Sequence, residues 1–193
     1  MSTPAAPRVL VLATGNPHKT EEVAAILAPD GWTVEPFVQE VEETGATFEE
    51  NALLKARAAA AATGDLAVAD DSGIEIDALG GAPGIHSARW TDEGEWIPRV
   101  LRDLQDVPDS WRGCRYVCAA AAAWPDGREV VVLGTVEARV TQAARGDGGF
   151  GYDPIVAPVE GDGRTFAEMT PDEKHQLSHR ARAFRALAPH LVL

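Results

Sequence analysis

The sequence has few cysteines, and its basic residues are outnumbered by acidic ones. The first shortage argues against a disulfide-rich protein, and the second against a protein that binds a nucleic-acid polymer. Among 193 residues the only cysteines are Cys114 and Cys118, which share one short apolar segment at a spacing that matches no metal motif. We expect two reduced core residues, which suits a cytoplasmic protein. The 30 acidic residues outnumber the 17 basic ones and give a formal net charge of -13. This charge disfavours a nucleic-acid polymer as the partner, because such binding neutralises many phosphates.

A long apolar run is also missing. No segment approaches the length of a membrane span, so we expect no membrane partner. Residues 1–7 are uncharged and lack an apolar centre, which argues against a signal peptide or an anchor and predicts a flexible tail. With a hydrophobic content of 45%, the 193 residues can bury a sizeable core, and we expect a single domain.

Two adjacent carboxylates stand at the centre of what the sequence does contain. Leu66 to Ala69 is typical of a buried strand, and Asp70 and Asp71 follow it directly. We expect Ser72 and Gly73 to bend the chain away after them. Because neighbouring side chains of a strand point to opposite faces, one carboxylate can serve a site while the other serves the scaffold. The alternative is a polar turn at the end of the strand.

A second candidate lies between an expected strand over 8–13 and the helix after it. Asn16 suits the N-cap of this helix, and Pro17 suits its first position. Free backbone N–H groups, the helix dipole and the early Lys19 all favour a bound anion here. The alternative is an ordinary strand-to-helix turn, since one of the two spaced glycines of a Walker A loop is missing. The whole loop comprises Thr14, Gly15, Asn16, Pro17, His18 and Lys19.

The next elements are predicted from turn signals and periodicity. We expect a strand over 32–38, and then a capping box, Thr47 with Glu50, that opens an alanine-rich helix to about Thr63. On that helix Lys55 can reach towards the nearby glutamates. We expect a short amphipathic helix within 91–105.

The second half of the chain should contain a hairpin and a glycine loop. Residues 112–124 and 128–141 flank a Pro-Asp-Gly turn, which favours a long hairpin although the alanines of the first arm also allow a helix. In the loop that follows, the rings of Phe150 and Tyr152 can stack on a planar base or pack into the core.

A helix should begin near the C-terminus at a capping box formed by Thr170 and Glu173. If it were unbroken, Lys174 and His179 would lie roughly 140° apart around its axis. We therefore expect a break near Ser178, which would cap a second helix. This break would let Lys174, His179 and Arg180 converge on one ligand.

Several short motifs together resemble the inosine triphosphate pyrophosphatase family, also described as Ham1-like or RdgB-like non-canonical purine nucleoside triphosphate pyrophosphatases. They occur in that family's order along nearly the whole chain, although each motif alone is weak. His18 departs from the pattern, because many members carry glycine there. The motifs are Thr14-Gly15-Asn16-Pro17-His18-Lys19, Ala69-Asp70-Asp71-Ser72-Gly73, Gly80-Gly81-Ala82-Pro83-Gly84-Ile85, Gly149-Phe150-Gly151-Tyr152-Asp153-Pro154 and Ser178-His179-Arg180.

The resemblance implies an α/β fold, with an elongated mixed sheet flanked by helices in two lobes and the active site in the cleft between them. It also implies hydrolysis of ITP, dITP and XTP to the monophosphate and pyrophosphate, Mg²⁺ as the cofactor, and a homodimer. Asp71 matches the general base and metal ligand, Glu42 the second metal carboxylate, and Lys19 the cation that neutralises the triphosphate held by residues 14–19. The implied substrate contacts are Ser72, Phe150, Gly151, Tyr152, Asp153, Lys174, His179 and Arg180.

Two alternatives stay open. One is a related nucleotide pyrophosphatase of the Maf type, against which the Ser-His-Arg and Phe-Gly-Tyr-Asp motifs argue. The other is a regulator that binds a magnesium nucleotide and has lost hydrolysis, against which the presence of Lys19, Glu42 and Asp71 together argues.

Overall fold

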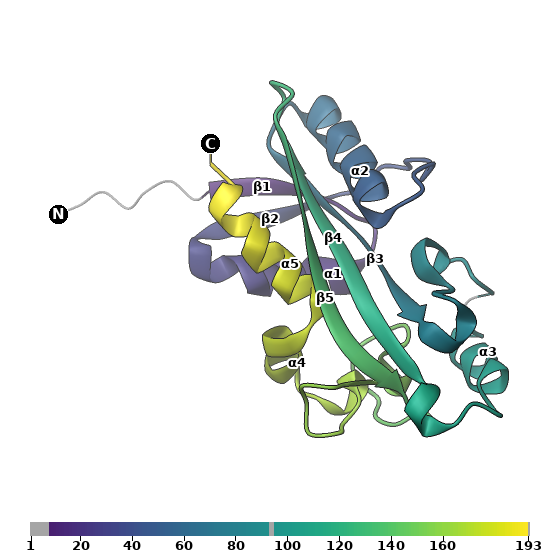
Figure 1. Cartoon of the computed structure of the whole chain (residues 1–193). Helices are drawn as coiled ribbons and strands as arrows, with labels where there is room; N and C mark the ends of the chain where they lie inside the picture. The colour runs from purple at the N-terminus through teal and green to yellow at the C-terminus, as the bar shows by residue number, and fades with distance from the viewer. Residues whose placement is uncertain (1–7, 93–94, 193) are drawn as a thin grey trace. The chain divides into compact units, whose positions relative to one another are not determined.

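Figure 1 shows the computed structural model, which describes residues 8–92 and 95–192. The expected tail over residues 1–7 therefore lies outside the described residues. The strands are β1 (Arg8–Ala13), β2 (Trp32–Phe37), β3 (Ala67–Ile76), β4 (Gly113–Ala123), β5 (Glu129–Val140) and β6 (Val156–Pro158). The α-helices are α1 (Pro17–Leu27), α2 (Phe48–Thr63), α3 (Trp96–Asp103), α4 (Pro171–Leu177) and α5 (His179–Leu187).

The strands form one mixed sheet in the order β2-β1-β3-β4-β5-β6. Strand β1 pairs in parallel with both β2 and β3, whereas β6 pairs antiparallel with β5. The alanines of β4 are buried, with exposed fractions of at most 2% from Ala119 to Ala123. They belong to a strand because the turn after them returns β5 alongside β4. The predicted α/β class, the mixed sheet and the hairpin are confirmed.

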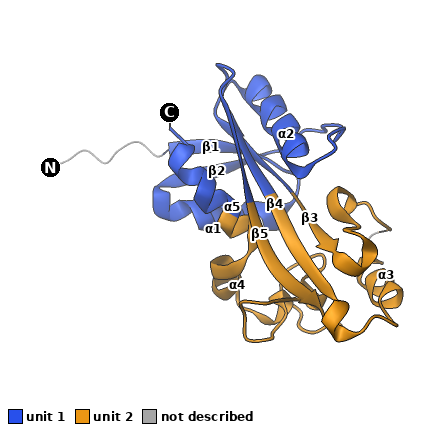
Figure 2. Ribbon diagram, viewed as in Figure 1, with its two compact units in different colours: residues 1–71, 119–133, 183–193 blue, residues 72–118, 134–182 orange. Residues whose placement is uncertain are grey.

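The chain divides into two compact units, coloured separately in Figure 2. The first comprises residues 1–71, 119–133 and 183–193, and the second comprises residues 72–118 and 134–182. Strands β3, β4 and β5 and helix α5 each contribute residues to both units. The core of the second unit includes Ile74, Ile76 and Phe166, all nearly inaccessible to solvent. The single-domain organisation stays a prediction.

One boundary differs from the predicted one. Strand β3 does not bend away at Ser72 and Gly73 but continues to Ile76. The reason is burial, because Ile74 and Ile76 are both 0% exposed and the Ile74 N–H donates to Ser87 Oγ at 2.9 Å. The short helix predicted within 91–105 is α3, which covers residues 96–103. Residues 93–94 of that range lie outside the described part.

The two cysteines are free thiols in the core of β4, as predicted. Burial, with smaller contributions from nearby carboxylates, raises the pKa of Cys114 to about 12, so its thiol stays protonated at neutral pH. Within the residues that the structure describes, no helix has the length and apolar character that crossing a membrane requires.

Candidate functional site

The residues singled out from the sequence fall into two groups. Those from Thr14 to Lys19, Glu42 and Asp71 belong to the first unit. Those of the glycine loop and of helices α4 and α5 belong to the second unit, together with Ser72. Asp71 and Ser72 are consecutive residues of β3, so one strand supplies both groups.

The loop between β1 and α1 is organised by its own side chains. Asn16 is the N-cap, as predicted, with an extended backbone and a side chain that accepts from the N–H groups of His18 at 3.0 Å and Lys19 at 3.4 Å. Thr14 Oγ1 accepts from the Asn16 N–H at 3.1 Å. These N–H groups are not free for an anion, contrary to the expectation. The Lys19 ammonium and the helix dipole still favour an anion at this loop.

The exposed His18 side chain leaves this cap intact, because His18 takes part through its backbone N–H. The departure from the family pattern at this position thus does not change how the loop begins α1.

The two carboxylates of β3 contact different lysines, as alternation along a strand predicts. Asp70 is 1% exposed, and its Oδ2 lies 2.9 Å from Lys19 Nζ. Asp71 Oδ1 lies 3.0 Å from Lys55 Nζ on α2, and Asp71 Oδ2 accepts from Asn51 Nδ2 at 3.4 Å. Asp70 is therefore more than scaffold, because it holds the lysine expected to meet the phosphates.

Lys55 joins two carboxylates. Its Nζ donates to Glu43 Oε1 at 2.8 Å as well as to Asp71. Burial works to lower the pKa of Lys55, but Asp71, Asp70 and Glu43 outweigh it, so the pKa is raised and the ammonium persists. Burial raises the pKa of Asp71, against the opposing effect of Lys55. The raised pKa makes the Asp71 carboxylate a better proton acceptor, although Lys55 opposes its protonation.

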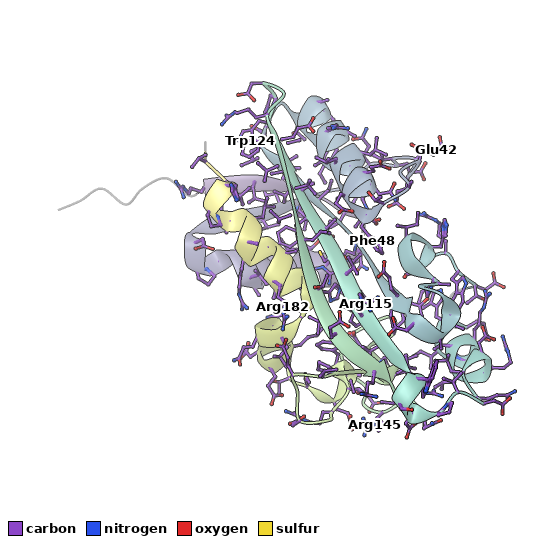
Figure 3. The ribbon with its side chains drawn as sticks, in the orientation of Figure 1. Glu42, Phe48, Arg115, Trp124, Arg145 and Arg182 are labelled. Atoms are coloured by element: carbon purple, nitrogen blue, oxygen red, sulfur yellow. The ribbon has the colours of Figure 1, made fainter. Side chains whose placement is uncertain are left out.

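The structure places the two candidate glutamates differently. Glu42 is exposed on the loop before α2, where Figure 3 labels it, whereas Glu43 shares Lys55 with Asp71. Across residues 8–92 and 95–192, no group of three or more His, Cys, Asp or Glu side chains is assembled for a metal. Mg²⁺ nevertheless fits this donor set, because it commonly takes one or two carboxylates together with substrate phosphates and water. Glu42 as a metal ligand stays a prediction.

In the second unit the centre is a buried carboxylate, Asp153, which is 3% exposed. It accepts from Lys174 Nζ at 2.7 Å, from the Phe150 N–H at 2.9 Å and from Tyr116 Oη at 3.1 Å. Burial, reinforced by Asp153, raises the pKa of Tyr116, so its hydroxyl stays protonated and donates. Gly149 has a φ of +67°, and a Cβ there would collide with the Asp153 carboxylate. This position therefore requires glycine.

The predicted break between the last two helices is confirmed. Ser178 has extended dihedral angles, φ -65° and ψ 150°, and its Oγ accepts from the Ala181 N–H at 3.2 Å. The break brings Lys174 and Arg180 to the same ring: Lys174 Nζ lies 4.7 Å and Arg180 Cζ 5.6 Å from the centroid of Phe150. Arg180 also donates to Ser72 Oγ at 3.4 Å.

Two predicted contacts, His179 and Tyr152, are buried. His179 is 6% exposed and stacks on Tyr116, with ring centroids 4.5 Å apart. Tyr152 is 5% exposed, donates from Oη to the Ser87 carbonyl at 2.8 Å and lies beside Trp96. Of the two alternatives for the loop aromatics, Tyr152 packs into the core, while Phe150 remains half-buried.

Comparison with known proteins agrees with this arrangement. Residues 10–190 match the Ham1 family. The chain belongs to the Ham1 family. A Streptomyces coelicolor protein named dITP/XTP pyrophosphatase is 50% identical over 191 residues, which cover 93% of this chain and 95% of that protein. A protein of the same name from Symbiobacterium thermophilum is 51% identical over 179 residues, with 90% of each chain covered.

Solved structures of Ham1 proteins resemble this one. A Ham1 protein from Coxiella burnetii superimposes with a TM-score of 0.84 at 38% identity, covering 95% of this chain and 98% of the other. A Staphylococcus aureus Ham1 protein gives 0.81 at 37% identity, with the same coverage. Membership of the Ham1 family confirms the resemblance seen in the motifs and decides against the Maf-type alternative.

Some residues of the site carried little or no sequence signal. Lys55 was indicated by its place on α2, but Asn51 and Glu43 were not singled out. Tyr116 lies in an apolar strand, where nothing in the pattern distinguishes a hydroxyl that serves a site from one that serves the core. These partners become visible only when segments far apart in sequence come into contact.

Proposed function

We propose that this Ham1-family chain hydrolyses dITP, ITP and XTP to the nucleoside monophosphate and pyrophosphate, with Mg²⁺ as the cofactor. The observation that carries the proposal is the β3 carboxylate pair, in which Asp70 holds Lys19 and Asp71 holds Lys55. This cluster combines a proton acceptor with two cations, which phosphoryl transfer requires. The names of the two relatives described above supply the substrate class.

In the proposed reaction the oxygen of a water molecule bonds to the α-phosphorus as the bond to the pyrophosphate oxygen breaks. The water proton passes to Asp71, and pyrophosphate leaves with the bonding electrons. Lys19 and Lys55 stabilise the negative charge on the phosphates. Mg²⁺, when bound, supplies further charge neutralisation, and Asp71 and Glu42 are the residues proposed to hold it.

Residues of the second unit would contact the nucleoside. Lys174 and Arg180 offer hydrogen-bond donors suited to the 6-oxo group of hypoxanthine or xanthine. The half-buried Phe150 ring, already flanked by both cations, offers an aromatic surface for the base. The buried side chains of Tyr152, Asp153 and His179 would act through neighbouring groups. The proposed contact set still comprises Ser72, Gly151, Tyr152, Asp153 and His179.

A direct test uses the purified chain with Mg²⁺ and a panel of dITP, ITP, XTP, dATP and dGTP. We expect the first three to release pyrophosphate and monophosphate in equal amounts, and EDTA to abolish the release. Orthophosphate in place of pyrophosphate would contradict the proposed bond cleavage. Tight nucleotide binding without any release would instead favour the regulator that has lost hydrolysis.

The metal ligand can be assigned by comparing two neighbouring variants. If Glu42 holds Mg²⁺, Glu42→Gln should raise the Mg²⁺ concentration for half-maximal activity about tenfold or more. Glu43→Gln should leave that concentration nearly unchanged, because Glu43 contacts Lys55. The reverse outcome, a larger Mg²⁺ requirement in Glu43→Gln alone, would move the second ligand to Glu43.

The proposal also includes a cytoplasmic homodimer, as the family resemblance implies. Light scattering from the purified chain would give the mass of two chains, and the mass of one chain would contradict this part of the proposal.

A further inference from the structure

The tripeptide Asp-Gly-Arg occurs twice in the sequence, and the two turns have the same local structure. In one, Arg128 donates to Asp126 from its backbone N–H at 3.0 Å and from Nε at 2.8 Å. In the other, Arg164 makes the same two contacts with Asp162, at 3.1 and 2.8 Å. The central glycines have φ values of 89° and 90°. The two arginines therefore share these local contacts but differ in what the rest of each guanidinium contacts.

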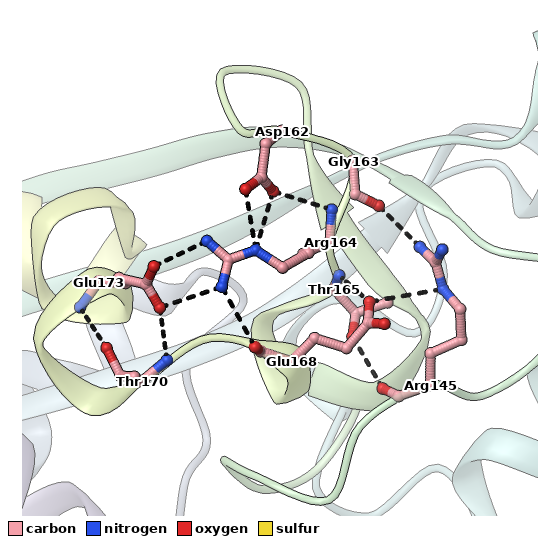
Figure 4. Close-up of polar contacts among 8 residues, drawn as sticks. All are labelled: Arg145, Asp162, Gly163, Arg164, Thr165, Glu168, Thr170 and Glu173. Atoms are coloured by element: carbon pink, nitrogen blue, oxygen red, sulfur yellow. Dashed lines mark hydrogen bonds and ion pairs between the residues drawn. The ribbon is translucent and has the colours of Figure 1, made fainter.

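The first guanidinium has no further carboxylate partner among the contacts of the described residues, and lies 4.9 Å from the ring of Trp124. The Arg164 guanidinium also contacts Glu173 through its two terminal nitrogens, as Figure 4 shows. Arg164 Nη2 lies 2.7 Å from Glu173 Oε1, and Nη1 lies 3.1 Å from Oε2. Two parallel bonds between a planar guanidinium and a carboxylate fix orientation as well as distance.

Glu173 is the third residue of α4 and part of its capping box. Its Oε2 accepts from the Thr170 N–H at 2.8 Å, while Thr170 Oγ1 accepts from the Glu173 N–H at 3.3 Å. Arg164, followed by Thr170, lowers the pKa of Glu173 to about 2, so the carboxylate stays ionised under any ordinary assay condition. Helix α4 has only seven residues, and so short a helix depends on its flanking contacts.

The turn that contains Arg164, residues 162–165, is hydrogen-bonded to the segment that carries Phe150 and Asp153. Arg145, at the start of that segment, donates from Nη2 to the Gly163 carbonyl at 2.8 Å. Thr165 Oγ1 donates back to the Arg145 carbonyl at 2.8 Å. The start of α4 and the beginning of the segment that carries Asp153 therefore both contact the turn at residues 162–165.

Lys174 follows Glu173 directly, and its ammonium lies 2.7 Å from Asp153. We propose that Arg164 is a positioning residue for Lys174: by binding both oxygens of Glu173 it sets the start of α4, and with it the place of the Lys174 ammonium. This inference rests on the proposed function, in which Lys174 contacts the purine. The pair is 39% and 41% exposed, so its contribution to global stability should be small. We expect the Arg164–Glu173 pair to affect the position of the Lys174 ammonium instead.

The test compares Arg164→Met and Arg164→Lys with Arg128→Met, which breaks the same local turn contacts away from α4. In Arg164→Met we expect the KM for dITP to rise about five- to tenfold, since small displacements of binding groups are costly. In the same variant, the ratio of kcat/KM for dITP to kcat/KM for dATP should fall. Inhibition by inorganic tripolyphosphate, which lacks a base, should keep its wild-type strength. Arg164→Lys should restore only part of the loss, because an ammonium cannot form the paired bonds.

Amide hydrogen exchange of residues 172–178 supplies a readout that needs no activity. Exchange should accelerate in Arg164→Met and remain at the wild-type rate in Arg128→Met. Failure of the wild type to hydrolyse dITP would remove the proposed function, while the exchange rates would still decide whether Arg164 holds α4. Unchanged exchange, an unchanged KM for dITP, or an equal weakening of tripolyphosphate inhibition would each overturn the inference.

Discussion

Replacing Asp71 with asparagine is expected to lower dITP turnover at saturating Mg²⁺ by about 100-fold or more, the scale of losing a positioned general base. Asparagine keeps the size of the side chain and can still accept from Asn51, but it cannot take a proton. The fold should persist, because Lys55 retains its bond to Glu43. Steady-state pyrophosphate release measures the effect, and circular dichroism checks the fold.

The matched control is Asp70→Asn, one residue earlier on β3. The sequence left one carboxylate of the pair for the scaffold, and the resemblance gave the catalytic role to Asp71. The 2.9 Å contact of Asp70 with Lys19 nevertheless predicts an effect on phosphate binding. We expect a smaller loss than in Asp71→Asn, seen mainly as a higher KM, because Asp70 acts through Lys19. Turnover within a few-fold of wild type in Asp71→Asn would remove Asp71 as the base. An equal loss of turnover in both variants would mean that the pair acts as one charged unit.

The wild-type enzyme is expected to use dITP at least about tenfold more efficiently than dATP, and Arg180→Ala should bring the two close to parity. Adenine carries a 6-amino donor where hypoxanthine carries a 6-oxo acceptor. Facing buried donors, that amino group would lose its hydration without gaining a partner, at a cost of about 1–3 kcal/mol. Each 1.4 kcal/mol or so corresponds to a factor of ten in kcat/KM.

Asp153 is the acceptor that Lys174 contacts, and the structure shows why it should not rescue adenine. Its two oxygens already accept from Lys174, Tyr116 and the Phe150 N–H. Asp153 is only 3% exposed, so an adenine amino group would have to move one of these donors aside to reach the carboxylate.

Arg185→Ala serves as the control for Arg180→Ala, because Arg185 lies on the same helix, α5, and is exposed. Its preference for dITP should equal that of the wild type. The measurement is kcat/KM for both nucleotides by pyrophosphate release. If the wild type used dATP and dITP equally well, selection by hydrogen-bond donors would be refuted.

The sequence by itself determined the local elements. Capping residues such as Asn16 and Thr170 satisfy the first N–H groups of their own helices, so the helix starts could be predicted from a few neighbouring residues. The break at Ser178 followed from the same short-range chemistry. The order of the motifs also sufficed to indicate the family, since it requires no knowledge of how they pack.

Tertiary structure alone decided which charged groups are partners. Lys19 with Asp70, Lys55 with Glu43 and Asp71, and Arg164 with Glu173 are separated by between 9 and 51 residues along the chain. No local periodicity encodes such pairs, because a charged side chain pairs with whichever opposite charge the tertiary packing brings within reach. Tertiary packing also decided where β3 ends. Burial of Ile74 and Ile76 outweighed the loop preference of Ser72 and Gly73, so the strand continues through them.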